Sequence, residues 1–185
     1  LGFLATGQPV PMPEQILLQG KILGTEEFLL ATPSEGRSAR SAGEELLAGK
    51  SQWITLLSEV LPRALLAELG LARILLGASG GGQFLLVLPG EAVPSAEEFL
   101  RNAATQISEL SAGVVKLVWA ATDNLGDWSI IRRRLTEQIE SLRHAPLQAI
   151  GTEAFQPFTP TATHEAEQYF AKELGAKIRE AQKIG

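Results

Sequence analysis

The residues of this sequence best suited to chemistry are three consecutive glycines, Gly80, Gly81 and Gly82, between Ser79 and Gln83. Glycine adopts positive φ angles and lets a ligand approach the backbone closely, so such a run can present N–H groups to a phosphate. The apolar runs on both sides of the glycines predict a β-hairpin with this run at its tip. We therefore predict nucleotide binding at these five residues, with a plain tight turn as the alternative.

Basic side chains form the second group of candidates. We predict contact with RNA or with a protein partner for Arg37, Arg40, Lys50, Arg132 and Arg133. The first three flank a polar segment rich in Gly and Ser, Ala31 to Gly43, which has the composition of a surface loop. The last two precede Arg134 on a predicted helix, where consecutive residues point in different directions. A solvated helix face is the alternative for them.

Other patterns lack the spacing that their chemistry requires. His144 and His164 have no second His or Cys at ligand spacing, so no metal site is predicted. The segment Gly43 to Ser51 imitates a phosphate-binding loop, but five residues instead of four separate its glycines and no strand precedes it. It is predicted to begin a helix. No serine lies in a nucleophile-elbow pattern, so no catalytic residue is predicted.

The composition describes a globular protein and restricts its partners. The chain has 185 residues, 45% of them hydrophobic, and a net charge of −5. That charge argues against coating nucleic acid by bulk electrostatics, so contact with any RNA is expected to be mostly indirect. The absence of cysteine fits a cytoplasmic protein, and no apolar run reaches the roughly 20 residues that cross a membrane. Because the sequence lacks an initiator Met, we expect a processed chain or a piece of a larger one.

Hydrophobic periodicity and turn residues predict the elements that position these candidates. Helix Ser95–Gly113 is expected to start with Ser95 as N-cap and Glu98 completing a capping box. Trp53, Trp119 and Trp128 are expected as core or interface anchors. The predicted strands are Ile16–Leu23, Ala72–Ala78, Gln83–Pro89 and Val114–Ala121; the predicted helices are Thr25–Leu30, Ala42–Gly70, Ser95–Gly113, Asp127–His144 and about Thr163–Lys183.

The order of these elements predicts the fold class. The middle of the chain is ordered β, α, β, β, α, β, which is the ferredoxin-like arrangement of an α+β protein, with an antiparallel sheet and both helices on one face. Polymerases and nucleotide cyclases use this arrangement as their Palm. We predict an extended lead-in at 1–14, a Palm domain at 15–150, and a linker with a C-terminal helix at 151–185.

A catalytic Palm needs carboxylates, and this one lacks them. Nucleotidyl transfer uses two divalent ions that are held by acids on the first strand and at the hairpin tip. The GGDEF pattern of diguanylate cyclases has Asp and Glu where this chain has Gly82 and Gln83, and Lys21, Ile22 and Leu23 occupy the strand positions. We therefore predict a degenerate site with no cofactor of its own.

Three segments together resemble the first Palm domain of the large subunit of type III CRISPR effector complexes. Lys21 to Leu29 resembles the strand and turn of that family, Leu47 to Glu59 its leucine-rich helix, and Ser79 to Pro89 its hairpin. The resemblance covers about Gly20 to Leu142. The family has Asp where Lys21 stands, and arginines where Ala48 and Lys50 stand.

The resemblance implies a part in antiviral defence. A second Palm of the family makes cyclic oligoadenylates from ATP, while the first Palm lacks the catalytic acids. This chain is then expected to be a structural and interaction part of an RNA-guided complex, with other protein subunits as partners, and to contribute to ATP binding. The alternative is a GGDEF-like module that senses a nucleotide without turnover. An active cyclase or polymerase is a third hypothesis, and a larger parent protein could still be an enzyme.

Overall fold

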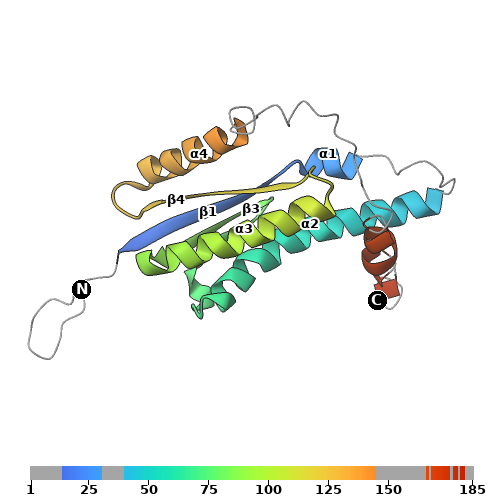
Figure 1. Ribbon diagram of the computed structural model, residues 1–185, viewed down its shortest axis with the longest axis horizontal. Helices are drawn as coiled ribbons and strands as arrows, with labels where there is room; N and C mark the ends of the chain where they lie inside the picture. Colours follow the sequence, from blue (N-terminus) through green and yellow to red (C-terminus); the bar gives the residue numbers. More distant parts are fainter. Residues whose placement is uncertain are drawn as a thin grey trace, which may run out of the picture.

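The protein is a layered α+β structure, seen here in a computed structural model (Figure 1). The structure describes residues 14–30 and 40–144 and, in the C-terminal segment, 166, 168–175, 177–178 and 180–181. Two long helices lie below the sheet in this view and a third helix lies above it. The predicted lead-in, the linker, Arg37 and His164 fall almost entirely outside the described residues, so the predicted domain boundaries stay predictions.

The sheet has the strand order of the predicted ferredoxin-like arrangement. Its strands are β1 (Gln15–Leu23), β2 (Leu76–Gly80), β3 (Gln83–Pro89) and β4 (Lys116–Asp123). They form one antiparallel four-stranded sheet in the order β2-β3-β1-β4. Because side chains alternate along a strand, each strand contributes to two different packing layers.

The main core lies between the sheet and two long helices, α2 (Arg40–Glu68) and α3 (Val93–Leu110). From the sheet it receives Leu18, Ile22 and Phe84, and from α2 it receives Leu65 and Leu66. Both helices of the βαββαβ unit therefore cover the same face, as predicted. The short helix α1 (Thr25–Leu30) connects β1 to this layer through its buried Phe28.

Helix α4 (Trp128–His144) covers the opposite face (Figure 1). Its buried residues Ile131, Leu135 and Ile139 pack against Leu17 of β1 and Ala120 of β4. The alternation along the strands thus places one apolar set under α2 and α3 and a second, smaller set under α4. The sequence predicted this helix, and the structure adds the face on which it packs.

Several predicted element boundaries were wrong: the strand predicted at Val114–Ala121 is Lys116–Asp123, the helix predicted to end at Gly113 ends at Leu110, and two starts also differ. The segment Arg73–Leu75 forms a 3-10 turn with Ile74 at 88% exposure, so the first hairpin strand begins only at Leu76. Helix α3 begins at Val93, after a preceding 3-10 turn, and no side chain caps it. Ser95 therefore lies inside the first turn and cannot be the N-cap. Pro94 explains the shift, because its fixed φ suits the first helical turn.

Segment Tyr169–Gly175, a π-helical turn, docks on the N-terminal half of α2. Phe170 is buried, and its ring lies 5.3 Å from both the Phe28 and the Trp53 ring. Gly49 and Gly175 lie at the contact, where neither position has room for a methyl group. The C-terminal helix predicted at 163–183 is only partly within the described residues.

Asp127 caps α4, and its loss is expected to destabilise that helix. The Ser129 N–H and hydroxyl both donate to Asp127 Oδ1 at 3.0 Å. The backbone bond, followed by the hydroxyl bond, lowers the pKa of Asp127 below its usual 3.8. A carboxyl pKa that is lower in the folded state stabilises the fold at pH above about 5, and this contribution disappears as the pH falls through the lowered pKa.

We therefore expect Asp127→Ala to lower the unfolding temperature at pH 7, and to lower it by less once acid has protonated the carboxyl. Asp127→Asn is the matched control, because asparagine is an equally good N-cap but does not titrate. It should retain most of the stability and lose the pH-dependent part. Thermal unfolding followed by circular dichroism measures both effects, and equal losses for Ala and Asn at every pH would contradict the capping role.

None of the helices within the described ranges combines the length and apolar character needed to cross a bilayer.

Candidate functional site

The glycine run forms the tip of the β2–β3 hairpin, as predicted. Gly81 and Gly82 have φ angles of 60° and 73°, and Gly80 has a φ of 141°. These are backbone conformations that only glycine adopts without strain. The N–H of Ile22 donates to the carbonyl of Gly82 at 2.7 Å, so the tip is fastened to the end of β1. The hairpin and the first strand thus meet where a catalytic Palm has its acids.

The side chains at this meeting point are basic and neutral. Lys21 stands opposite Gln83 in the strand register. The Lys21 ammonium lies 3.7 Å from a carboxylate oxygen of Glu140 on α4. The Gln83 Oε1 accepts a hydrogen bond from Gln19 Nε2 at 3.4 Å. Over the described part of the chain, no group of three or more His, Cys, Asp or Glu residues is arranged to hold a metal ion.

Glu59 is the carboxylate that the sequence analysis missed. It projects from the middle of α2 and lines a cavity beside Gly80–Gly82. The Arg63 guanidinium lies 2.6 Å from Glu59 Oε2, and the Ser79 hydroxyl lies 3.5 Å from the same oxygen. Arg63 therefore already neutralises this acid. No sequence signal marks it, because Glu59 is one of several polar residues along a long amphipathic helix.

Two cavities flank the hairpin tip on opposite sides of the sheet. The first, the α2-side cavity, has a volume of about 290 Å³ and is lined by Ile22, Thr25, Thr55, Ser58, Glu59 and Gly80–Gly82 among others. Its hydroxyl groups and glycine backbone are neutral. The structure therefore offers hydrogen-bonding groups at the predicted nucleotide site but gives it no cation on this side.

The second cavity, the hairpin–α4 cleft, has a volume of about 390 Å³. The hairpin contributes Ser79, Gly80 and Gln83, and α4 contributes Trp128, Arg132 and Thr136. Two groups of residues that were predicted separately, one for nucleotide and one for RNA or a partner, therefore line one cavity. The shared cavity could not be inferred from the sequence, because the two groups are about fifty residues apart.

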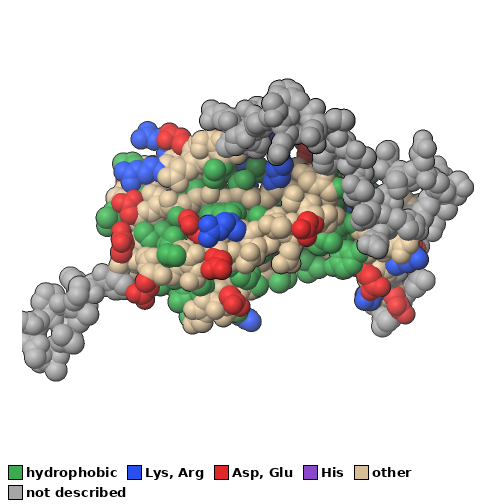
Figure 2. Space-filling view, in the orientation of Figure 1, with side chains coloured by type: hydrophobic (Ala, Val, Ile, Leu, Met, Phe, Trp, Pro, Cys, Tyr) green, Lys and Arg blue, Asp and Glu red, His purple; other side chains and the backbone are tan. Residues whose placement is uncertain are grey.

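The three arginines of α4 differ in their surroundings. Arg134 lies 3.3 Å from Asp123, and Arg133 lies 3.8 Å from Glu137 one helical turn away. Arg132 lines the hairpin–α4 cleft instead. The prediction that consecutive arginines diverge is confirmed, and basic and acidic side chains are mixed over this helix (Figure 2). RNA or partner contact by Arg132 and Arg133 stays a prediction.

Lys50 is buried rather than displayed on the surface. It is 7% exposed, its ammonium donates to the Phe28 carbonyl at 3.0 Å, and it lies 4.8 Å from the centre of the Phe28 ring. The residue therefore helps to hold α1 against α2. Its contact with RNA or a partner stays a prediction. The burial of the side chain argues against that contact. Arg40 begins α2, and its side chain lies outside the described residues.

We expect Lys50→Met to lower the free energy of unfolding by about 2–3 kcal/mol, because it removes a charged hydrogen bond and strands a buried carbonyl. Urea unfolding measures the loss. Lys116→Met is the control, since Lys116 is exposed on β4 and its replacement should change the stability by less than about 0.5 kcal/mol. A Lys50→Met variant that keeps its stability and loses a partner would instead support the predicted contact.

The structure shows where the three tryptophans and the segment that imitates a phosphate-binding loop lie. Trp53 is buried in the main core, and Trp119 is partly buried and packs against the same core. Trp128 is 52% exposed, so it is not a core residue. The segment Gly43–Ser51 lies within α2 and has no loop geometry, which confirms that it is a helical segment.

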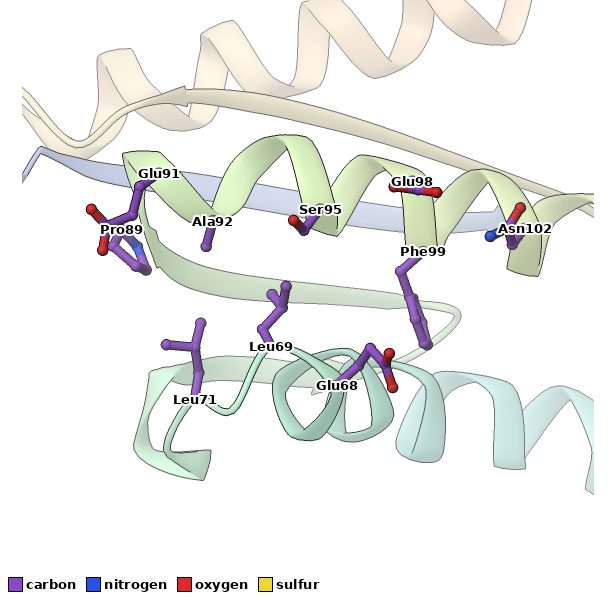
Figure 3. A pocket seen from close by; sticks show the side chains of 10 residues that line it. All are labelled: Glu68, Leu69, Leu71, Pro89, Glu91, Ala92, Ser95, Glu98, Phe99 and Asn102. Carbon is purple, nitrogen blue, oxygen red and sulfur yellow. The ribbon is translucent and has the colours of Figure 1, made fainter.

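A further cavity, of about 640 Å³, lies between α2 and α3, away from the hairpin tip (Figure 3). Phe99 points from α3 toward α2 across it, and Leu69 and Leu71 line its other side. Its acids, Glu68, Glu91 and Glu98, are spread along the groove and do not converge on one point (Figure 3). The arrangement offers no paired groups for acid–base chemistry or for metal binding.

Several solved structures that contain Csm1 have a similar fold. Csm1 from T.onnurineus matches 70% of this chain with a TM-score of 0.59 and 18% identity. The Csm1-Csm4 cassette in complex with cA3 matches 75% with a TM-score of 0.61 and 17% identity. The Csm1-Csm4 subcomplex of the type III-A CRISPR-Csm interference complex matches 70% with a TM-score of 0.60 and 18% identity.

The fold resembles the Palm region of Csm1, the large subunit of type III-A CRISPR complexes. The chain spans about a fifth of the length of the Csm1 chains that it matches, between 18% and 20%. No protein-family model matches the sequence, and no curated protein matches it significantly. At this identity the likeness to Csm1 establishes the fold, and the function is argued below from the site.

Proposed function

We propose that this chain is a catalytically degenerate first Palm, a structural and interaction part of the large subunit of a type III CRISPR effector complex. One observation carries the proposal. On a sheet with the fold of the Csm1 Palm region, Lys21, Gly82 and Gln83 occupy the strand end and hairpin tip where catalysis requires metal-binding acids. The site therefore lacks the charges that phosphoryl transfer needs.

Electrostatics supports this reading of the site. Two unit charges 4 Å apart interact by about 4 kcal/mol at the effective dielectric constant near a protein surface. A lysine beside the hairpin tip thus repels a divalent cation, whereas an aspartate would attract it. The acids Glu140 and Glu59 near the hairpin tip are each paired with a basic side chain. Titration calorimetry with Mg²⁺ and Mn²⁺ should detect no millimolar binding, and Mg²⁺-dependent turnover of ATP by this chain alone would contradict the proposal.

The outer face of α2 supplies a surface for subunit contact. Leu56 and Val60 are 38% and 53% exposed, although each is large and apolar. Leu56 and Val60 are four residues apart, so they lie together on one side of the helix. A set of exposed apolar side chains on one helix is typical of an interaction surface. We propose that this face packs against the remainder of the large subunit.

Co-expression with the remaining segments of a type III large subunit and with a Csm4-type subunit tests the proposal. We expect the chain to co-purify with them, and the double substitution Leu56→Asp with Val60→Asp to abolish the association. Leu142→Asp is the matched control, because Leu142 is exposed to a similar extent, 41%, on α4. A stable monomer that retains no partner under these conditions would refute the structural role.

We further propose that this chain contributes to ATP binding beside an active Palm. The α2-side cavity supports it, because the glycine backbone and Thr25 line one space of about 290 Å³ together with Thr55 and Ser58, whose hydroxyls donate to backbone carbonyls of α2. The same cavity also favours the second candidate, a nucleotide-sensing module that acts alone. Calorimetry with ATP, GTP and cyclic dinucleotides distinguishes them: binding by the isolated chain that Thr55→Glu in the α2-side cavity abolishes supports the sensor, and ATP binding that requires the second Palm supports the effector subunit.

A further inference from the structure

The hairpin–α4 cleft lies on the other face of the sheet from the α2-side cavity, and its two walls differ in character. One wall is the helix stripe Trp128, Arg132 and Thr136, and the other is the hairpin with Gly80 and Gln83. Residues four apart on a helix share a face, and the stripe covers two turns, about 12 Å. The buried neighbours Ile131, Leu135 and Ile139 hold this stripe in place against the sheet.

The indole at one end of the stripe is available to a ligand. Trp128 is 52% exposed at the start of α4, where it lines the cleft. An exposed tryptophan offers a flat apolar surface. Any of the nucleobases can stack on such a surface, because each has a flat π-face. The fold gains little from this side chain, because the buried residues of α4 already provide its packing.

The middle of the stripe is cationic. Arg132 forms no ion pair with any residue in the described ranges, in contrast to Arg133 and Arg134 beside it. No acidic side chain lines the cleft among the described residues. In a chain with a net charge of −5, an arginine facing an acid-free cavity attracts anions to that cavity. A guanidinium also fits the fork geometry of a phosphate group.

The hairpin wall carries further hydrogen-bonding groups. The Gln19–Gln83 bond uses one N–H of Gln19 and the oxygen of Gln83, so that bond does not occupy the amide N–H groups of Gln83. Gly80 lies at the same wall, and its positive φ leaves the backbone open to close approach. The floor is apolar, with Leu85 and Leu135. A volume of about 390 Å³ lies within the range of small-ligand sites.

We propose that the hairpin–α4 cleft binds one nucleotide, with its base stacked on Trp128 and its phosphate held between Arg132 and the hairpin tip. The nucleotide is either free or part of a single-stranded RNA, since both present the same base and phosphate. The cleft has no rigid set of donors and acceptors for a base edge, so binding should depend little on the identity of the base. This site is separate from the proposed role as a subunit.

Fluorescence titrations of the purified chain with a nucleotide labelled on its ribose (mant-ATP) and with a fluorescein-labelled ten-nucleotide poly(A) RNA test the proposal. We expect binding of at least one probe. Arg132→Ala and Trp128→Ala should each weaken it by about tenfold or more, in line with the value of one stacked base. Arg133→Ala is the matched control, because it removes the same charge from the next residue, and it should weaken binding less than twofold.

The two probes distinguish the sources of the ligand. Binding of both probes with similar affinity assigns a free nucleotide, and binding of the RNA alone assigns a single strand. Absence of binding with both probes at millimolar concentration overturns the proposal. Equal losses for Arg132→Ala and Arg133→Ala also overturn it, because they indicate diffuse charge attraction. The variants are exposed and should fold, and thermal unfolding together with retained subunit association verifies this.

Discussion

Replacing Gly20 with alanine should lower the free energy of unfolding by about 3 kcal/mol or more, at or above the upper end of what overpacking usually costs. Gly20 lies in the middle of the sheet, on β1 and opposite Phe84 of β3. A methyl group at Gly20 would overlap the Phe84 ring, which is 1% exposed and belongs to the main core. Neither the ring nor the central strand can move without opening that core. Urea unfolding followed by circular dichroism measures the loss.

Gly77→Ala is the matched control for Gly20→Ala. Gly77 lies on the edge strand β2 of the same sheet. A methyl group there would make only ordinary van der Waals contacts, and its nearest neighbour would be the Leu85 carbonyl oxygen at 3.5 Å. We expect a change of less than about 0.5 kcal/mol for this control. If both variants unfold at the same urea concentration, the close packing between Gly20 and Phe84 does not determine stability.

Gly20 also matters for the candidate site. Phe84 directly follows Gln83, and the carbonyl of Gly82 accepts the Ile22 N–H bond that fastens the tip to β1. Displacing Phe84 would therefore shift the hairpin tip relative to β1 and alter both flanking cavities at once. Any loss of ligand binding in Gly20→Ala must consequently be interpreted together with its stability, whereas Arg132→Ala and Trp128→Ala report on the ligand alone.

The sequence predicted the topology because the topology depends on short-range patterns. Alternating apolar residues, the glycine run and the 3.6-residue period of α2 were sufficient to place every strand and long helix within a few residues. The boundaries that were wrong depend on details of the backbone. A 3-10 turn begins before Leu76, and Pro94 allows α3 to start ahead of Ser95. Such shifts by two to five residues leave the periodicity unchanged, so the pattern does not reveal them.

The arrangement of the candidate site could not be predicted in the same way. That Gly82 and Gln83 stand beside Lys21 followed from the resemblance and from the strand order, and the register confirms it. That Arg132 lines a cleft with Ser79 depends on the face of the sheet that α4 covers, which local sequence does not encode. The burial of Lys50 likewise depends on how α1 folds back on α2, because a lysine in a helix is expected to be exposed.

Replacing Gly49 with alanine should detach the C-terminal segment from α2 and leave the sheet intact. A methyl group at Gly49 would overlap the backbone carbonyl oxygen of Phe170, and a backbone atom cannot move aside as a flexible side chain can. Phe170 would then leave its contacts with Phe28 and Trp53. Removing a buried phenylalanine from a core costs about 3–5 kcal/mol. We expect trypsin to cleave at Lys172 much faster in this variant, and Trp53 fluorescence to shift to the red.

Gly43→Ala is a stringent control, because it makes the same substitution in the same helix six residues earlier, where a methyl group would meet nothing within 4 Å. Alanine favours a helix over glycine by about 1 kcal/mol, so this variant should be as stable as the parent or more so. Replacing Trp119 and Trp128 with phenylalanine in every variant leaves Trp53 as the only tryptophan, which excitation at the red edge of the absorption band selects over Tyr169. If Gly49→Ala retains protection of Lys172 and the emission of buried Trp53, then the segment does not depend on the close approach at Gly49, and the aromatic contacts alone hold it in place.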